Sequence, residues 1–485
     1  MAEVASSHEF AKTMRWYDGF VLSLTMPAAL VAALGYSIGA LGGWSAIALW
    51  GAAMVLATLM NWVYSEMAAM FPDKPGGIAL YAHEGWKRHL SLVGPVATFG
   101  YWFAWTGAIA VFASIIGSLV QAQWFSGQDW TSDWVLFELT FPKLVAVAVL
   151  VALWAVNVLG LQITLRLAYV TGALLMIPLF VFIVLPYFTG DWSADRLTWR
   201  LGDDGDGLRT ALVWLYIMGW TAFGVETCAA FAPEYRDGVR DTSRALKAAA
   251  LFSLGVFVLL PLGITGVVGE QAIAEDPVTF YVLAFEAIVG GASGVMVAFI
   301  IASLILVMNT SLADGSRALY GIAEDRMTVR QLHHLNSRGV PARAMTIALV
   351  VNLVLILLVT NTLAILATGN LGYILAHIFA LTGFLLLRRD RPSWPRPIRL
   401  PAIFLPLTAV LAVVLTAILV VGATSFSITG YGGPRELWIA LGVLASSLVL
   451  FVFRRVVQDH EPIRLRDRED ENVPSTAGSR DTAPR

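Results

Sequence analysis

Twelve apolar stretches, each long enough to cross a bilayer, constrain the fold of this 485-residue chain more than any other feature. In lipid, only helices and closed barrels satisfy every backbone polar group, and about 20 apolar residues are enough for a spanning helix. Hydrophobic residues make up 58% of the chain and charged residues only 14%, which excludes an ordinary soluble protein. The sequence therefore predicts an all-α polytopic membrane protein with twelve transmembrane helices.

The predicted spans divide the chain into three parts. Residues 1–18 carry charges and lack a small-residue cleavage site, so we interpret them as a retained N-terminal segment and not as a signal peptide. Residues 19–455 form the transmembrane domain. The tail, residues 456–485, is charged and rich in Pro, Ser and Thr, which predicts disorder. The spans are expected at 19–41, 44–70, 92–121, 141–160, 167–188, 210–231, 245–268, 279–312, 342–360, 363–387, 399–422 and 434–455.

Basic residues are distributed unevenly between the two sides of these spans. All but five of the 32 Lys and Arg residues fall on one side, and the exceptions are Lys143, Arg196, Arg200, Arg209 and Arg435. Loops rich in Lys and Arg stay in the cytoplasm. We therefore expect a multi-pass protein of the cell membrane with both termini in the cytoplasm.

Composition also excludes several kinds of chemistry. A net charge of −2 gives no reason to expect a nucleic-acid partner, and the single cysteine, Cys228, excludes an internal disulfide. The predicted spans contain no cluster of His, Cys and Asp, no nucleophile beside a base and no metal-ligand spacing. The sequence therefore predicts neither an enzyme nor a metal or cofactor site.

The span at 210–231 contains a glutamate at membrane depth. Glu226 ends the stretch Gly219-Trp220-Thr221-Ala222-Phe223-Gly224-Val225-Glu226, in which two glycines weaken the helix. A carboxylate at this depth is costly, so it faces the bundle interior or a water-filled cavity and indicates a functional site. The alternative is a buried, protonated glutamate that only ties helices together.

The span at 19–41 is also interrupted. Pro27 has no N–H group and its ring clashes with the carbonyl four residues earlier, so this helix should kink or open between Ser23 and Ala29. A proline kink without a ligand role is the alternative. The two interrupted spans lie five helices apart, which is the spacing of a five-plus-five inverted repeat with a substrate site at the midplane. Freed amides suit a carboxylate and freed carbonyls suit an ammonium group or a cation, so a zwitterion such as an amino acid matches the site.

Three motifs resemble those of the amino acid–polyamine–organocation (APC) superfamily of transporters. Trp220 to Glu226 is similar to the family pattern of helix 6, Glu66 to Gly77 to the end of helix 2, and Ser316 to Pro341 to the segment that joins helices 8 and 9. The resemblance covers about residues 15–455. It implies an amino acid permease with the LeuT-like arrangement, broken helices 1 and 6, and secondary active transport by alternating access.

The resemblance also implies roles for individual residues. Trp220 would act as a lid beside the substrate, and Ser311 would lie near the pocket with Thr310. The substrate's α-carboxylate and α-amine would be held by the backbone around Met26, Pro27, Ala28, Ala29, Leu30, Thr221, Ala222, Phe223 and Gly224. The sequence does not determine the coupling ion. Glu226 could carry a proton, and Thr310 and Ser311 could help to bind sodium. An exchange of one solute for another would need neither ion.

Two of the departures of this sequence from the family pattern lie within predicted spans. Pro27-Ala28-Ala29 stands where relatives show a glycine-serine-glycine type of run, and Leu174-Leu175-Met176 stands where some proton-coupled relatives place a lysine. The apolar residues around the breaks favour a neutral substrate side chain. A polyamine or organic amine exchanger, and a non-transporting receptor or scaffold of the same fold, are the alternatives. The expected partners are a small-molecule substrate and the lipid bilayer, and the sequence does not determine the oligomeric state.

Overall fold

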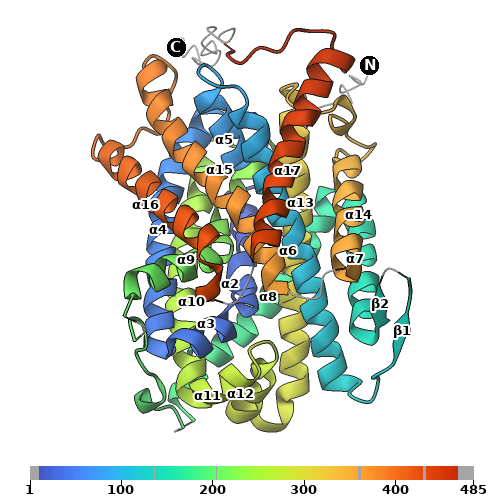
Figure 1. Ribbon diagram of the computed structural model, residues 1–485, viewed down its shortest axis with the longest axis vertical. Coiled ribbons are helices and arrows are strands. Elements are labelled where there is room, and N and C mark those ends of the chain that lie inside the picture. The colour runs from blue at the N-terminus through green and yellow to red at the C-terminus, as the bar shows by residue number, and fades with distance from the viewer. Residues whose placement is uncertain are drawn as a thin grey trace, which may run out of the picture.

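The computed structural model describes residues 10–467 except Leu136, Gly190, Asp204, 359–361 and 430–432. Long helices run approximately along the longest axis of the molecule and form one bundle (Figure 1). The described chain starts and ends at the same end of this bundle, which we call the top end after its place in Figure 1. A small β-hairpin and the short helices α11 and α12 lie at the opposite, bottom end.

The elements follow one another along the chain with mostly short connections. In order they are α1 (Trp16–Ser23), α2 (Thr25–Ala29), η1 (Leu30–Ala32), α3 (Leu34–Leu41), α4 (Gly43–Met70), α5 (Gly77–Trp86), α6 (Val93–Trp124), β1 (Thr131–Asp133), β2 (Glu138–Thr140), α7 (Phe141–Val158), α8 (Leu161–Ile183), η2 (Leu185–Tyr187), η3 (Ala194–Arg196), α9 (Gly207–Phe223), η4 (Gly224–Glu234), α10 (Arg240–Val268), α11 (Glu270–Glu275), α12 (Phe280–Val289), η5 (Gly290–Ala292), α13 (Ser293–Glu324), η6 (Arg330–Leu332), α14 (Ala342–Leu358), α15 (Thr362–Asp390), α16 (Phe404–Thr424), η7 (Phe426–Ile428), α17 (Pro434–Phe453) and η8 (Arg454–Gln458). The two strands pair antiparallel, with Thr131 opposite Thr140.

Ten helices of the described part of the chain are long and apolar enough to cross a membrane, and the bent pair that begins at Trp16 would make eleven. The predicted span at 342–360 corresponds to α14, an apolar helix of 17 residues. The fold is thus that of a multi-pass helical membrane protein. The number of twelve spans stays a prediction.

One predicted span differs in its bounds. The sequence predicts a single helix over 279–312, whereas the structure has α12 first and begins α13 only after a turn at Gly290, where φ is +65°. Glycine adopts this left-handed backbone without steric cost. The helix α13 then runs on to Glu324, so the polar stretch from Asn309 to Arg317 lies inside the helix and not at its end.

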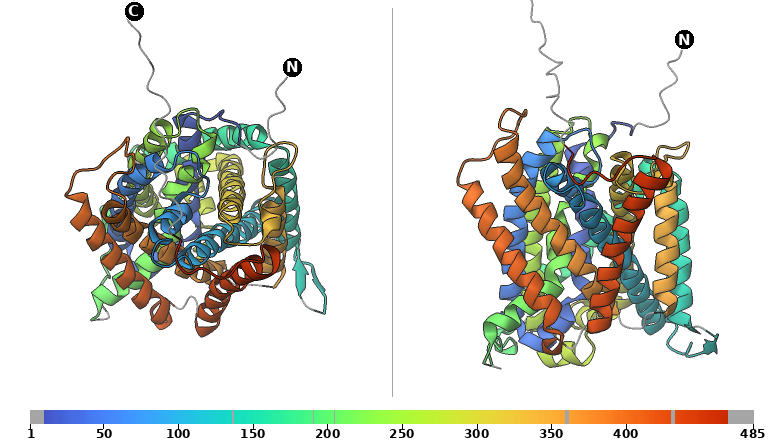
Figure 2. Two further views of the ribbon diagram at one scale, coloured as in Figure 1. Left: turned by 90° about the horizontal axis from the view of Figure 1, so that it is seen from above. Right: turned by 45° about the horizontal axis from the view of Figure 1, so that its top comes forward.

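The bundle has a buried centre and a lipid-exposed rim. The helix α6 is the most enclosed of the spans, whereas α7, α16 and α17 are the least; Figure 2 shows α16 and α17 at the rim. At the centre, α6 packs against α13 and α15. Gly100 and Gly372 allow this approach, because a Cβ atom on either would clash with the backbone of the other.

Buried ion pairs organise the top end. Glu84 of α5 accepts from Lys74 Nζ at 2.7 Å, and its other oxygen lies 3.0 Å from Lys87 Nζ and 3.2 Å from Arg391 Nη1. Burial by itself would raise the pKa of the Glu84 carboxyl, but these cations outweigh it and hold the pKa well below its ordinary value. The helix α5 that carries Glu84 is almost entirely buried.

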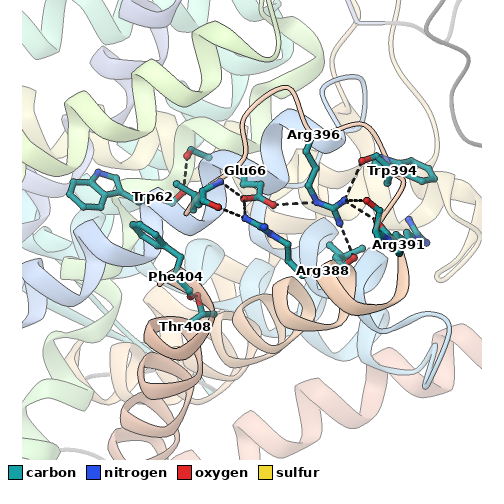
Figure 3. A network of polar contacts seen from close by, with 12 residues as sticks. Trp62, Glu66, Arg388, Arg391, Trp394, Arg396, Phe404 and Thr408 are labelled. Atoms are coloured by element: carbon teal, nitrogen blue, oxygen red, sulfur yellow. Dashed lines mark hydrogen bonds and ion pairs between the residues drawn. The ribbon is translucent and has the colours of Figure 1, made fainter. Parts of the chain in front are cut away.

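A second buried carboxylate fixes the segment between α15 and α16 (Figure 3). Glu66, at the end of α4, accepts from Arg388 Nη2 at 2.6 Å and from the Leu400 amide at 2.8 Å, and Arg396 Nε lies 3.3 Å away. Arg396 in turn donates to the carbonyls of Leu387 and Arg391. Glu66, the first residue of the motif Glu66 to Gly77, therefore holds the segment between α15 and α16 in place.

The chain after α17 lies along this top end. Glu461 pairs with Arg326 and Arg455, and the Leu465 carbonyl accepts from the Ser91 amide at 2.8 Å. Residues 456–467 thus have defined contacts. The rest of the predicted disordered tail, 468–485, and residues 1–9 lie outside the described residues.

Candidate functional site

The first span changes direction near the middle of the bundle, where Figure 1 places α2. The helix α1 ends at Ser23, the short helix α2 carries Pro27, and η1 follows. The 44° bend lies between Ala32 and Leu34, a few residues beyond the stretch in which the sequence predicts it. Pro27 fits inside α2 because it lies at the third position of that helix, where its missing N–H costs no intrahelical bond.

The span that contains Glu226 changes its winding at Gly224. It is α-helical from Gly207 to Phe223 and then continues as a 3₁₀-helix of 11 residues to Glu234. Such a long 3₁₀ stretch is uncommon, because its hydrogen bonds are poorer than those of an α-helix, and it often marks a functional hinge. Pro233 near its end has no N–H to continue an α-helix.

The two changes of winding meet in space. A Cβ atom on Gly224 would overlap Met26 Sδ and would approach the ring of Trp105 to 3.3 Å. Trp105 packs edge-on against Trp220 at a centroid distance of 5.2 Å, and Phe112 covers the same indole at 5.7 Å. The predicted lid residue therefore lies in an aromatic cluster from α6 and α9, beside the contact between α2 and η4.

The structure divides the predicted contacts of the first span between two sides. Met26 faces Gly224, whereas Pro27, Ala28 and Leu30 line an apolar crevice with Leu175 and other residues of α8, α10, α12 and α13. Ala29 is fully buried. Apolar Leu175 therefore lies beside the first span, at the position where the resemblance led us to look for a lysine.

Polar groups at the site are buried and several lack partners. Thr310 Oγ1 donates to the Leu22 carbonyl at 3.4 Å, which joins α13 to the end of α1. Thr221 Oγ1, Ser311 Oγ and Trp220 Nε1 are buried without a hydrogen-bond partner in the described part of the chain. Ala222 and Phe223 contribute only buried apolar surface. Buried polar groups without partners are costly, so they indicate where a polar ligand or water would be stabilised.

Glu226 is fully buried and bonded only to hydroxyl groups among the described residues. Tyr373 of α15 donates to Oε1 at 2.7 Å, and Tyr101 of α6 lies 3.4 Å from Oε2. Tyr101 also donates to Asp314 Oδ2 at 2.7 Å. The sequence analysis assigned no role to Tyr101, Tyr373 or Asp314, because sequence alone does not show which residues of other helices lie beside Glu226.

A buried ion pair closes the top end of this region. Arg317 Nη2 lies 3.1 Å from Glu234 Oε2, its Nε contacts Oε1, and both side chains are almost fully buried. The guanidinium also covers the ring of Phe231 at 4.4 Å. Met14 pairs with Tyr235 next to it, so the N-terminal segment covers the pair. Within the described residues, no group of three or more His, Cys, Asp or Glu side chains could hold a metal ion.

Comparison with known proteins identifies the family. The family described as Amino acid permease matches residues 16–449 of the chain. The chain belongs to the amino acid permease family. This match includes both changes of winding, Glu226 and the buried ion pair. The protein is therefore an integral membrane protein of a family of transporters, and the family is not one of enzymes.

Individual permeases are similar to the chain at low identity. An uncharacterized amino acid permease of Bacillus subtilis, YvbW, is 26% identical over 71% of this chain and 77% of its own length. The γ-aminobutyric acid permease of the same organism is 24% identical over 62% of each chain. A putative arginine/ornithine antiporter of Escherichia coli is 27% identical over 47% of this chain and 48% of its own. Two of these relatives are named for different substrates and the third for none, so they leave the substrate of this permease open.

Proposed function

We propose that this permease is a secondary active transporter that moves an amino acid across the cell membrane by alternating access. The observation that carries this proposal is the contact between Met26 and Gly224, where two interrupted spans meet in the buried centre of a permease. Interrupted helices at the bilayer midplane are the usual place of a substrate site in transporters of this kind. The loops that are rich in Lys and Arg support an orientation with both termini in the cytoplasm.

The substrate site is proposed at the junction of α2 with η4. Backbone groups of Met26, Ala28, Thr221 and Gly224 would hold the α-carboxylate and α-amine. Thr221 Oγ1 and Ser311 Oγ, which have no partner among the described residues, are suited to polar contacts with the same groups. Trp220, supported by Trp105 and Phe112, would cover the substrate.

The apolar and aromatic lining supports a substrate with a neutral side chain. Met26, Phe223, Trp105 and Trp220 present carbon surface, and an apolar pocket gains affinity chiefly from burying apolar groups. The buried ion pair of Arg317 with Glu234 is consistent with a site that is closed toward the top end. Rocking of the interrupted spans against the rest of the bundle would break this pair and open the site.

Thermal stabilisation of the purified protein tests the substrate class. The panel contains the twenty standard amino acids, D-serine, ornithine, γ-aminobutyrate and putrescine, each with and without sodium and at two pH values. A ligand that binds only the folded state raises the apparent free energy of unfolding by about 2.7 kcal/mol when its concentration is 100 times its Kd. The melting temperature rises as a result. We expect a rise with neutral amino acids. A rise with putrescine alone would support the amine exchanger instead, and no rise with any compound would support the non-transporting alternative.

A further inference from the structure

Asp314 belongs to the same buried group as Glu226. Both carboxyls are fully buried, they come from α13 and η4, and the hydroxyl of Tyr101 contacts Oδ2 of Asp314 at 2.7 Å and Oε2 of Glu226 at 3.4 Å. None of the three residues was assigned a shared role by the sequence. The structure therefore places two acidic side chains on either side of one hydroxyl in the centre of the bundle.

The two contacts of the Tyr101 hydroxyl determine how many protons the two carboxyls carry. A tyrosine hydroxyl has a single proton, and it can donate that proton to only one of the two carboxyls. The second contact is a hydrogen bond only if the other carboxyl is protonated and donates to the tyrosine oxygen. Both contacts are satisfied when Glu226 and Asp314 together carry one proton.

The basic group that acts on Asp314 is already engaged with other residues. Arg317, one turn along α13 from Asp314, is the basic group whose charge reaches it, but its guanidinium is bonded to Glu234 and to the Ala313 carbonyl. The other titratable groups around the two carboxyls are Tyr373, Tyr64, Tyr81, Cys228 and, against the Tyr373 ring, His377. Two like charges so close together in a buried site cannot both stay ionised.

An independent observation points to a small ligand at the same place. Thr227, fully buried on η4, faces the Asp314 carboxyl but forms no hydrogen bond of normal length and angle with it. Asp314 Oδ1 likewise has no partner among the described residues. Buried oxygens without partners are costly, and a proton on the carboxyl or one water would complete their hydrogen bonds.

We infer that Glu226 and Asp314, joined by Tyr101, form one proton-carrying pair and that this pair couples transport to the proton gradient. The inference rests on the proposed transport function and names its coupling ion. The pair takes up one proton from water on the side to which the site is open, and it releases the same proton to water on the opposite side after the site has reopened there. Asp314 then provides a side chain that can carry a proton, which Leu175 cannot do.

The test uses purified full-length protein in liposomes and a radiolabelled mixture of the twenty standard amino acids. Two measurements are compared: accumulation driven by an acidic outside, and exchange at equal pH on both sides. For Asp314→Asn we expect gradient-driven accumulation to fall at least tenfold, while exchange stays within twofold of the wild type. Tyr216→Phe is the matched control for Tyr101→Phe, because Tyr216 is also buried and donates to a carbonyl, that of Ala367. Only Tyr101→Phe should lower accumulation.

Each other result overturns the inference in a distinguishable way. Unchanged accumulation in Asp314→Asn excludes Asp314 from coupling, and loss of exchange in a variant with a wild-type melting temperature gives it a binding role instead. Accumulation of the mixture by the wild type with sodium and without a pH gradient assigns coupling to sodium. A wild type that neither accumulates nor exchanges the mixture contradicts the transport function itself.

Infrared spectroscopy tests the shared proton without transport and applies even if the asparagine variant does not fold. The wild type at neutral pH should show the C=O stretch of a protonated carboxylic acid in its core, and Glu226→Gln/Asp314→Asn should lose it. A wild type without such a band contradicts the inference.

Discussion

Gly224 and Met26 lie so close together that a single methyl group at position 224 would overlap the sulfur of Met26. The contact joins η4 to α2, so the start of the 3₁₀ stretch touches the short helix that precedes the bend of the first span. A methyl group there requires the Met26 side chain to move, and the ring of Trp105, 3.3 Å from the added carbon, limits the room for it. The proposed substrate site depends on this contact.

Gly224→Ala should therefore impair the site. We expect loss of substrate-induced stabilisation and a destabilisation of about 1–3 kcal/mol, the usual cost of overpacking a core. Thermal unfolding with and without substrate measures both effects. The control is Gly442→Ala on α17, where an added Cβ atom would meet no described atom beyond the adjoining turns of its own helix and alanine favours the helix by about 0.5–1 kcal/mol. Equal behaviour of the two variants would contradict a close contact at Gly224.

The buried ion pair of Glu234 with Arg317 should contribute to the stability of the protein. Arg317→Met should destabilise the protein by about 3–5 kcal/mol, because it leaves the Glu234 carboxylate buried and unpaired. Glu234→Gln/Arg317→Met should be more stable than Arg317→Met alone. The matched control is Lys12→Met, which breaks the exposed pair with Asp73 and should have little effect on the melting temperature. A loss no larger than that of the control would show that the buried pair contributes little.

Much of the architecture is readable from the sequence, because bilayer thickness sets the length of every span. The run from Gly43 to Met70 is an example, and its end follows from Phe71-Pro72 and the glycines after it. The length of the apolar stretch at 279–312 wrongly predicted a single helix. There the turn at Gly290 separates α12 from α13, and both sides of the turn are apolar, so hydropathy carried no signal.

The site was less predictable because it depends on contacts between distant segments. Glu226 was recognisable as a costly carboxylate at membrane depth. Its partners Tyr101 and Tyr373, and Asp314 on the other side of Tyr101, come from three other helices, and only the packing of α6, α13 and α15 brings them together. A polar residue predicted inside a membrane helix was the available signal, and it was missed at Asp314 because α13 was ended too early.

Glu66 should control the segment between α15 and α16. In Glu66→Gln, Arg388 and Arg396 lose their carboxylate, and the segment from Arg391 to Leu400 loses its anchor (Figure 3). Trypsin should then cut after Arg399, which, unlike Arg391 and Arg396, is not followed by proline, several times faster than in the wild type. Asp73→Asn, which removes an exposed carboxylate near the same end, is the control and should leave the rate unchanged.

Glu270 predicts how stability depends on pH. Burial alone would raise the pKa of its carboxyl, but donors from the Gly43 and Thr198 amides, the Thr198 hydroxyl and Arg200 outweigh burial and lower it. As the pH falls below the ordinary value of about 4.5, the unfolded chain binds the proton first. The contribution is therefore complete above that pH and is lost as the pH falls through the lower pKa of the folded protein.

Glu270→Gln should accordingly lower the melting temperature near pH 7 and reduce the difference from the wild type in acid. Glu275→Gln, on the same short helix, is the control and should follow the wild type at every pH. A difference between Glu270→Gln and the wild type that does not change with pH would show that charge at Glu270 is not what joins these loops.

Transport by the reconstituted protein tests the central claim most directly. Wild-type protein in liposomes should take up labelled amino acids from the mixture of twenty, and Trp220→Ala should reduce uptake at least tenfold by removing the lid. Trp438→Ala, which removes an indole that is 70% exposed on α17, should transport like the wild type. Uptake by the wild type that is unaffected by Trp220→Ala would contradict the proposed site, and no uptake of any amino acid by the folded wild type would contradict transport itself.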